Sequence, residues 1–513
     1  MATSTRRAPL FVYPPLPKNE IRLYCAITAC AIVYAWWCVY KASTRWTFRI
    51  GHFASVTELP IFGRRFKDEI DWEWTRWSPI ALSYLPYLLF NSAVFNLAPR
   101  FVSEKVWIPI YIATSMCSTA IVYTPRLVAY SLAQGVFVFY CTHLCRSTWV
   151  VWLSSLPILY VVMNHTTVLS DDPFLVLLFV SYTLLSYISF NLERVRGNTR
   201  PEDNTVGALL LRMLFYAFYQ PYLISLIVLY PDFERQFRER NIKRRNWKRT
   251  FLLALRIGFW WALLQFVLHF LYFNSILHDV EFSATLPKNE FVTLGMAMCN
   301  FFHLKYVIIF GVPTVFALLD NMQPKDGPIC IARVALISKI WRGFDRGLYD
   351  FFKVQMRLEY LHLPICQPTF SFPRKILGIL ISYGFVLMWH GFLHHNVIWV
   401  LLNIIELIIE FGSKGIYSIE SVKKWREDHL SDTNFRRVLA WLQIVPFAFG
   451  LYSNFYFLGG SKIGYLFVER IFWQETVPVR WPFLLLISIG YNYMHVTMEA
   501  ERWLSSREKL KSV

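Results

Sequence analysis

Long apolar runs alternate with short polar or charged segments along the whole chain. A run of about 17–25 apolar residues is long enough to cross a bilayer as a helix. The pattern therefore predicts an all-α, polytopic membrane protein with about 10–12 membrane segments. Some runs are short or broken by proline, so we expect some segments to re-enter the membrane rather than cross it. The runs cover residues 23–42, 79–97, 106–123, 128–143, 148–163, 173–191, 207–230, 251–273, 291–318, 376–410, 437–457 and 482–498.

The runs continue from residue 23 to residue 500 without an internal repeat or a low-complexity linker. One integral membrane domain over 23–500 is the simplest interpretation. Residues 1–22 are polar and Pro-rich and are expected to be a cytosolic or interfacial tail, and residues 501–513 a short basic tail. No small-residue cleavage site follows the first apolar run, so we expect this run to be an uncleaved span.

Loop charge predicts the orientation in the membrane. The loop 234–250 is dense in lysine and arginine, whereas the few charged residues of 274–290 are mostly acidic. Cytosolic loops carry an excess of basic residues, so the first loop is predicted to be cytosolic and the second luminal. The segment after Asp320 is basic again and should return to the cytosol. Within it, residues 341–352 interleave basic and aromatic side chains at helical spacing, which predicts an interfacial amphipathic helix.

Composition supports the membrane assignment and narrows the partners. Hydrophobic residues make up 55% of the chain and charged residues 17%, too little polar surface for a soluble protein of this size. The net charge is +18. Basic loops beside anionic lipid account for that charge, so nucleic acid is not an expected partner. The 9 cysteines show no CxxC pair and form an odd count, which argues against a disulfide framework or a zinc module.

The most informative run is 376–410, which is apolar on both sides of Trp389, His390 and Gly391. An ionisable side chain inside membrane-spanning sequence is costly and is a functional-site hypothesis by default. An imidazole has the right chemistry for proton transfer near neutral pH, so His390 is a candidate general base. The structural alternative is a core histidine that bonds a neighbouring carbonyl.

His394 follows His390 by four residues, with His395 beside it. On one continuous helix, His390 and His394 would share a face, and such a pair can bind a metal. No HExxH motif or third ligand stands at an informative spacing, so a metal site is not predicted there.

A second motif surrounds Asp345, in the sequence WRGFDRG over residues 341–347. Asp345 lies between Arg342 and Arg346 beside an apolar face. One interpretation is a solvated charge cluster on an interfacial helix. The other is a carboxylate that orients a substrate or the catalytic imidazole.

Several short motifs follow one another in a fixed order: YVIIFGVP at 306–313, Leu319-Asp320, PIC at 328–330, WRGFDRGLYDFF at 341–352, MWHG at 388–391 and SNFYFLGG at 453–460. This series resembles the hedgehog acyltransferases, within the membrane-bound O-acyltransferase (MBOAT) superfamily. The resemblance is dense over 291–473. Upstream, DWEWTRW at 71–77 is also similar to a family element.

The resemblance implies a helical MBOAT core and the transfer of palmitoyl from palmitoyl-CoA to the N-terminal cysteine amine of a secreted signalling protein. A membrane tunnel would join a cytosolic donor entrance to a luminal acceptor entrance. By the same resemblance, His390 is the catalytic histidine and Asp345 the essential aspartate. Trp341 would line the acyl-CoA path, Asn454 match a family asparagine, and Cys330 match a cysteine that ligates haem b.

The physical chemistry of the donor is compatible with this prediction. Basic side chains such as Arg342 on a cytosolic amphipathic helix suit the phosphates of CoA. An apolar channel suits the acyl tail, since each buried CH2 contributes about 0.8 kcal/mol. A thioester is already activated, so positioning, proton removal and oxyanion stabilisation suffice for direct transfer. Water must be excluded, because hydrolysis competes.

One departure separates this chain from the family pattern, since the stretch 219–228 lacks a His-Asn-Gly-Pro element. Alternatives to the protein acceptor are a lipid or glycerol hydroxyl, or a non-catalytic membrane regulator with the same fold. Acyltransferase-like members lack the catalytic histidine, whereas this chain keeps His390, which favours an enzyme. We expect a monomer among membrane lipids in the endoplasmic reticulum, with the Golgi as the alternative compartment.

Overall fold

A computed structural model describes residues 11–46, 49–52, 54–168, 170–200, 205–223, 225–356, 371–476 and 478–511. In this part of the chain the fold is helical apart from one short β-hairpin. The predicted all-α class is therefore confirmed. The division into a tail at 1–22, a domain at 23–500 and a tail at 501–513 stays a prediction.

The first half of the chain contains the following elements: α1 (Lys18–Arg45), β1 (Ala54–Leu59), β2 (Gly63–Asp68), α2 (Trp72–Leu97), α3 (Glu104–Val122), α4 (Pro125–Cys145), α5 (Thr148–Asn164), α6 (Pro173–Leu175), α7 (Ser181–Val195), α8 (Val206–Ala217), α9 (Tyr230–Glu239) and α10 (Trp247–Leu268). The second half contains α11 (Phe273–His278), α12 (Val280–Thr285), α13 (Lys288–Leu319), α14 (Ile337–Phe344), α15 (Arg346–Asp350), α17 (Ser371–His390), α18 (His394–Tyr417), α19 (Glu420–His429), α20 (Asp432–Phe467), α21 (Gln474–Thr476) and α22 (Trp481–Lys511).

Membrane-spanning capacity is distributed over the whole described chain. Among the described residues, 9 helices are long and apolar enough to cross a bilayer, from Lys18–Arg45 to Asp432–Thr476. The helices Thr148–Asn164, Val206–Ala217 and Ile376–His390 are apolar but shorter. The chain is therefore a multi-pass membrane protein, and the shorter helices are the ones suited to partial crossing.

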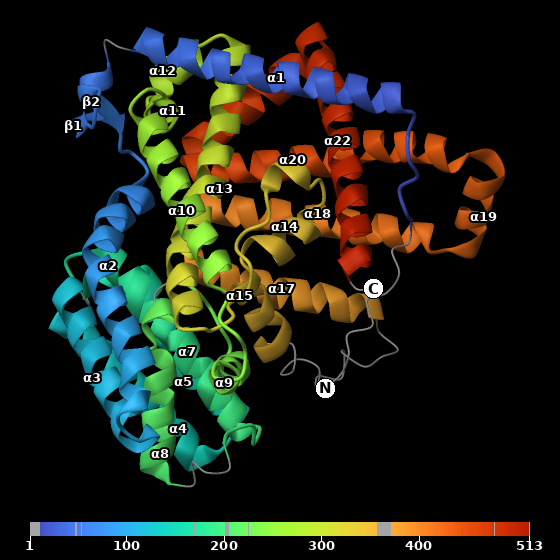
Figure 1. Cartoon of the computed structure of the whole chain (residues 1–513). Coiled ribbons are helices and arrows are strands. Elements are labelled where there is room, and N and C mark those ends of the chain that lie inside the picture. The colour runs from blue at the N-terminus through green and yellow to red at the C-terminus, as the bar shows by residue number, and fades with distance from the viewer. Residues whose placement is uncertain are drawn as a thin grey trace.

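The helices form two groups with α10 and α13 between them (Figure 1). One group contains α2, α3, α4, α5, α7 and α8, and the other contains α17, α18, α20 and α22. Helices α10 and α13 pack against each other, as do α18 and α20, while α1 lies across one end of the molecule against α13 and α22. The motifs of the sequence analysis thus meet where α13, α14, α17, α18 and α20 come together.

The run 207–230 is not a single membrane segment. Helix α8 ends at Ala217, and a buried one-turn helix, Gln220–Tyr222, follows it. The Gln220 side-chain amide donates to the Ser115 carbonyl oxygen at 2.9 Å and to Thr119 Oγ1 at 3.0 Å. These hydrogen bonds join the turn to α3 and satisfy the buried donor group of the Gln220 amide. This turn occupies the stretch where the His-Asn-Gly-Pro element is missing.

One aspartate ties this turn to two helices. Tyr219 Oη donates to Asp320 at 2.8 Å, and Asn96 Nδ2 donates to the same carboxylate at 2.8 Å. Asp320 is 1% exposed at the end of α13, and burial raises its pKa to about 7. The Leu319-Asp320 motif therefore has a structural role, because it joins α2, α13 and the turn after α8.

The β-hairpin is the element that apolar periodicity did not predict. Strands β1 and β2 pair antiparallel between α1 and α2, with Ile61 at φ 75° in the turn. Asp68 accepts hydrogen bonds from the backbone N–H of Asn274 at 2.8 Å and from Ser275 Oγ at 2.7 Å. The hairpin therefore packs on the loop that was predicted to be luminal.

Candidate active site

The chain turns sharply at the Trp389-His390-Gly391 motif. Helix α17 ends at His390, Gly391 has φ 84°, and α18 begins at His394. The side-chain amide of Asn396 donates to the carbonyl oxygens of His390 at 2.7 Å and Gly391 at 3.1 Å. Asn396 thereby satisfies carbonyl groups that a helix end leaves without partners.

This turn corrects the interpretation of 376–410 as one continuous run. His390 lies at a helix end rather than in the middle of a span, because glycine tolerates the positive φ that breaks the helix. His394 therefore does not share a helical face with His390. It hydrogen-bonds the Tyr465 hydroxyl at 2.9 Å instead. Among the described residues no cluster of three metal-ligating side chains is found.

Aromatic rings hold the His390 imidazole. It meets Trp399 of α18 edge-to-face at 5.2 Å and Phe457 of α20 at 5.1 Å between ring centroids. Trp399 and Phe457 are themselves stacked at 4.2 Å. The ring nitrogens of His390 make no hydrogen bond within the part of the chain that the structure describes. The imidazole is thus oriented by ring packing rather than by hydrogen bonds to other described residues.

Asp345 lies at a break between two short helices. The amphipathic helix predicted over 341–352 is wrong as a single element, because α14 ends at Phe344 and α15 begins at Arg346. Asp345 has an extended backbone and caps α15, accepting from the Leu348 N–H at 2.9 Å. Burial raises its pKa to about 6, although that hydrogen bond acts in the opposite direction.

Asp345 and His390 are linked through rings rather than directly. Phe344, next to Asp345, stacks on Phe302 of α13 at 5.4 Å. Phe302 contacts Phe457 at 5.9 Å, and Phe457 contacts His390. No hydrogen bond between Asp345 and His390 is found among the described residues. The structure gives Asp345 a local capping role beside the rings that lead to His390. We call these rings the aromatic layer: Phe302, Phe344, Trp399 and Phe457.

Trp341 joins the same layer. Its indole N–H donates to Asn403 Oδ1 at 3.1 Å, and its ring lies 5.1 Å from Tyr383 and 5.8 Å from Trp399. Trp341 and His390 therefore flank Trp399 from different elements. This position suits the predicted role of Trp341 along a substrate path that ends at His390.

The other predicted site residues, Arg342, Asn454 and Cys330, have no contact with the His390 imidazole among the interactions described above. Arg342 is exposed, and its guanidinium donates to the Ser338 carbonyl oxygen at 2.7 Å. Asn454 donates to the Gly450 carbonyl oxygen within α20 at 2.8 Å, one turn before Phe457. Cys330 has an exposed free thiol beside the Ile329–Gly343 backbone hydrogen bond. A cysteine thiolate is one of the side chains that can bind haem iron, so the Cys330 thiol has the donor chemistry that the haem prediction requires.

The structure also contains a buried charge cluster beside this layer that the sequence pattern did not predict. Lys305 of α13 is 3% exposed and lies 2.9 Å from Asp71 and 2.8 Å from Glu73. The Tyr306 hydroxyl also donates to Glu73 at 2.9 Å. The signal was present, since a lysine inside the apolar run 291–318 requires partners. This cluster explains why the DWEWTRW element accompanies YVIIFGVP.

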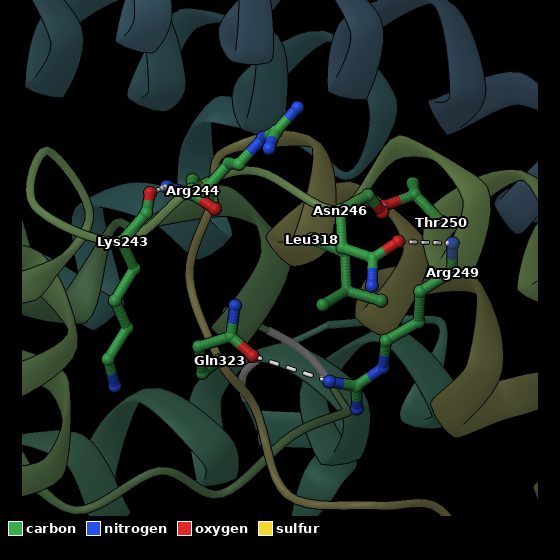
Figure 2. A pocket seen from close by; sticks show the side chains of 8 residues that line it. Lys243, Arg244, Asn246, Arg249, Thr250, Leu318 and Gln323 are labelled. Atoms are coloured by element: carbon green, nitrogen blue, oxygen red, sulfur yellow. Dashed lines mark hydrogen bonds between the residues drawn. The ribbon is translucent and has the colours of Figure 1, made fainter.

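A basic pocket opens near the start of α10 (Figure 2). It has a volume of about 350 Å³ and is lined by Lys243, Arg244, Asn246, Arg249, Thr250, Leu318, Asn321 and Gln323. Arg249 reaches Gln323 across it and lies 3.5 Å from Asp326, which also pairs with Arg346 at 3.8 Å. The pocket contains none of the predicted site residues, but this ion-pair chain connects it to α15.

Comparison with known proteins gives the class. No family model matches the chain. The chain is 25% identical over 501 residues to protein-cysteine N-palmitoyltransferase HHAT of Mus musculus, covering 94% of this chain and 98% of that protein. It is 28% identical over 291 residues to protein-cysteine N-palmitoyltransferase Rasp of Drosophila melanogaster, 56% of each. Membrane-bound O-acyltransferase GUP1 of Millerozyma farinosa is 23% identical over 292 residues, 56% of this chain and 54% of that protein.

The fold, the ordered motifs and these relatives define the chain as an acyltransferase of the membrane-bound O-acyltransferase superfamily. Within that superfamily its likeness extends along almost the whole length of an HHAT-type enzyme, which confirms the resemblance to the hedgehog acyltransferases.

The turn at Gly391 gives the first test. Gly391→Ala should reduce acyl transfer and lower the thermal midpoint, because a non-glycine residue at positive φ costs about 1–2 kcal/mol. Gly384→Ala is the matched control in α17, where an added Cβ meets nothing within 4 Å. Alanine there should be neutral or stabilising by about 0.5–1 kcal/mol. Equal behaviour of the two variants would contradict the role of the turn.

Asp345 gives a pH-dependent test. Because its folded-state pKa is raised to about 6, the wild-type protein should lose stability as pH rises from about 4 to about 6. Asp345→Asn keeps a good capping side chain without the charge. At pH 7.5 it should be more stable than wild type by up to about 2–3 kcal/mol, and the difference should vanish near pH 4. Thermal unfolding in detergent measures this, and Asp345→Ala, which loses the cap, controls for it. A lower midpoint for Asp345→Asn at pH 7.5 would count against the assignment.

Proposed function

We propose that this acyltransferase transfers palmitoyl from palmitoyl-CoA to the N-terminal amine of a secreted, hedgehog-type signalling protein. The observation that carries the proposal is the His390 imidazole at a helix break between Trp399 and Phe457, with ring nitrogens that bond no other described residue. The names of HHAT and Rasp support a cysteine N-terminus as acceptor.

In the proposed reaction, the acceptor amine attacks the thioester carbonyl carbon as a ring nitrogen of His390 takes a proton from it. The C–N bond forms and the C–S bond breaks. The proton then passes to the departing sulfur, so the products are the amide and CoA thiol. No covalent enzyme intermediate is required, because a thioester is already activated. His390 contributes proton transfer, and the aromatic layer contributes orientation and exclusion of water.

The two substrates approach from opposite sides in this proposal. The basic residues 234–250 and Arg342 and Arg346 suit the phosphates of CoA on the cytosolic side. Trp341 then borders the path toward His390. The acceptor enters from the luminal side, where the hairpin and the loop after α11 lie. Together these entrances define a tunnel across the membrane, and we place the enzyme as a monomer in the endoplasmic reticulum or the Golgi.

Haem b is proposed at Cys330 as a bound group only. The exposed Cys330 thiol would hold the haem iron, and none of the transfer steps involves this group.

A second candidate changes the acceptor to a lipid or glycerol hydroxyl. The likeness of about half the chain to membrane-bound O-acyltransferase GUP1 favours it. The donor, His390 and the proton transfer would be the same in both cases. The acceptor therefore has to be identified by where the acyl group goes.

The test uses the full-length protein in microsomes with labelled palmitoyl-CoA. A peptide with a free N-terminal cysteine should take up label, and the same peptide with an acetylated amine should not. Label in lipid and none in the peptide would favour the second candidate. His390→Ala should lower transfer by about 10²–10⁴-fold at unchanged expression and membrane insertion, as expected for a lost acid–base group.

His394→Ala is the matched control, since His394 lies on α18 and bonds Tyr465. It should retain transfer. Full activity of the His390→Ala variant would contradict the proposed role of His390.

A further inference from the structure

The buried face of α18 carries two carboxylates, one turn apart, in opposite situations. Glu410 is 5% exposed and fully engaged, accepting from the Ser338 N–H at 3.0 Å and pairing with Lys414. Glu406 is 1% exposed, and its Oε2 has no hydrogen-bond partner. No ion pair of Glu406 is found within the described residues either. The described residues supply partners for the Glu410 carboxylate and none for the Glu406 carboxylate.

The surroundings of Glu406 are shaped around it. A Cβ added at Gly450 of α20 would lie 3.0 Å from Glu406 Oε2 and 3.2 Å from Oε1. The glycine therefore leaves just enough room for the carboxylate against the α20 backbone. An unpaired carboxylate in apolar surroundings is costly, so a site of this kind requires a proton or a hydrogen-bond donor from outside the described part of the chain.

Nearby polar groups indicate where a hydrogen-bond donor to Glu406 would lie. Tyr383 of α17 is 5% exposed, and its hydroxyl makes no hydrogen bond to another described residue. Its ring contacts Trp341, whose indole bonds Asn403, one turn before Glu406 on the same face of α18. Two unsatisfied polar groups thus flank the Trp341 position, on the path proposed to end at His390.

The distance along α18 between the His390 turn and Glu406 indicates which part of an acyl-CoA molecule would lie beside Glu406. Asn396, which holds the His390 turn, and Glu406 are ten residues apart, or about 15 Å along the helix axis. Ser338 and Arg342 lie beyond Glu406, at Glu410. A CoA thioester with its carbonyl at His390 and its phosphates at the basic residues would lay its pantetheine arm between these points. That arm carries secondary amides.

We propose that Glu406 accepts a hydrogen bond from an amide N–H of the pantetheine arm of the acyl-CoA donor, with Tyr383 completing the polar contact. This inference rests on the proposed function, because it takes His390 as the position of the thioester. Glu406 would then be a residue that binds acyl-CoA. Its hydrogen bond would let the enzyme distinguish a CoA thioester from a simple acyl thioester without these amides.

The test measures binding and turnover separately. Glu406→Leu removes the acceptor, and Glu406→Gln keeps a neutral one. The dissociation constant of a non-hydrolysable palmitoyl-CoA analogue, and the KM for palmitoyl-CoA, should rise about tenfold or more in Glu406→Leu and less in Glu406→Gln, as a lost hydrogen bond to a charged group implies. The kcat should change little. Ile405→Leu, on the exposed face of α18, is the matched control and should leave both constants unchanged.

A second ligand keeps the proposal testable whatever the stability of the variants. A palmitoyl-CoA analogue with N-methylated pantetheine amides cannot donate this hydrogen bond. Wild type should bind it about tenfold more weakly than the parent analogue, and Glu406→Gln should discriminate less between the two. Equal discrimination by wild type and Glu406→Gln would overturn the assignment of Glu406. Loss of palmitoyl transfer by wild type itself would overturn the proposed function instead.

Discussion

The site depends on how polar groups are accommodated where helices end inside an apolar domain. Asn396 bonds the carbonyl oxygens of His390 and Gly391, so the chain can stop one helix and start the next without leaving these acceptors bare. Once this turn is stable, α17 and α18 diverge and the imidazole faces the aromatic side chains of α18 and α20. Without this turn, α17 and α18 would form one continuous helix, and His390 would lie within the helix instead of at its end.

The aromatic layer then does two physical tasks. It orients His390 by edge-to-face contacts with Trp399 and Phe457, and it surrounds the imidazole with apolar ring surface. The same layer continues through Phe302 to Phe344, which brings the Asp345 break close without a direct bond. The buried ion pairs of Lys305 with Asp71 and Glu73 join α13, which carries Phe302 of this layer, to the start of α2.

The apolar pattern was sufficient to predict the fold class, because membrane helices leave a strong signal in any sequence. It also singled out His390, since an imidazole in such a run is unusual. The helix breaks were not predictable: Gly391 and Asp345 are compatible with helix and turn alike, and tertiary hydrogen bonds decide between them. Glu406 stood within the run 376–410, but only the packing of α18 on α20 shows that it lacks a partner while Glu410 has several.

In the proposed function, acyl transfer occurs at the His390 turn. A structure of the full-length enzyme with a non-hydrolysable palmitoyl-CoA analogue tests it most directly. The thioester carbonyl should lie within hydrogen-bond reach of a His390 ring nitrogen, about 3 Å, with the phosphates toward the basic residues. A bound analogue whose thioester lies outside the aromatic layer around Trp399 and Phe457 would contradict it.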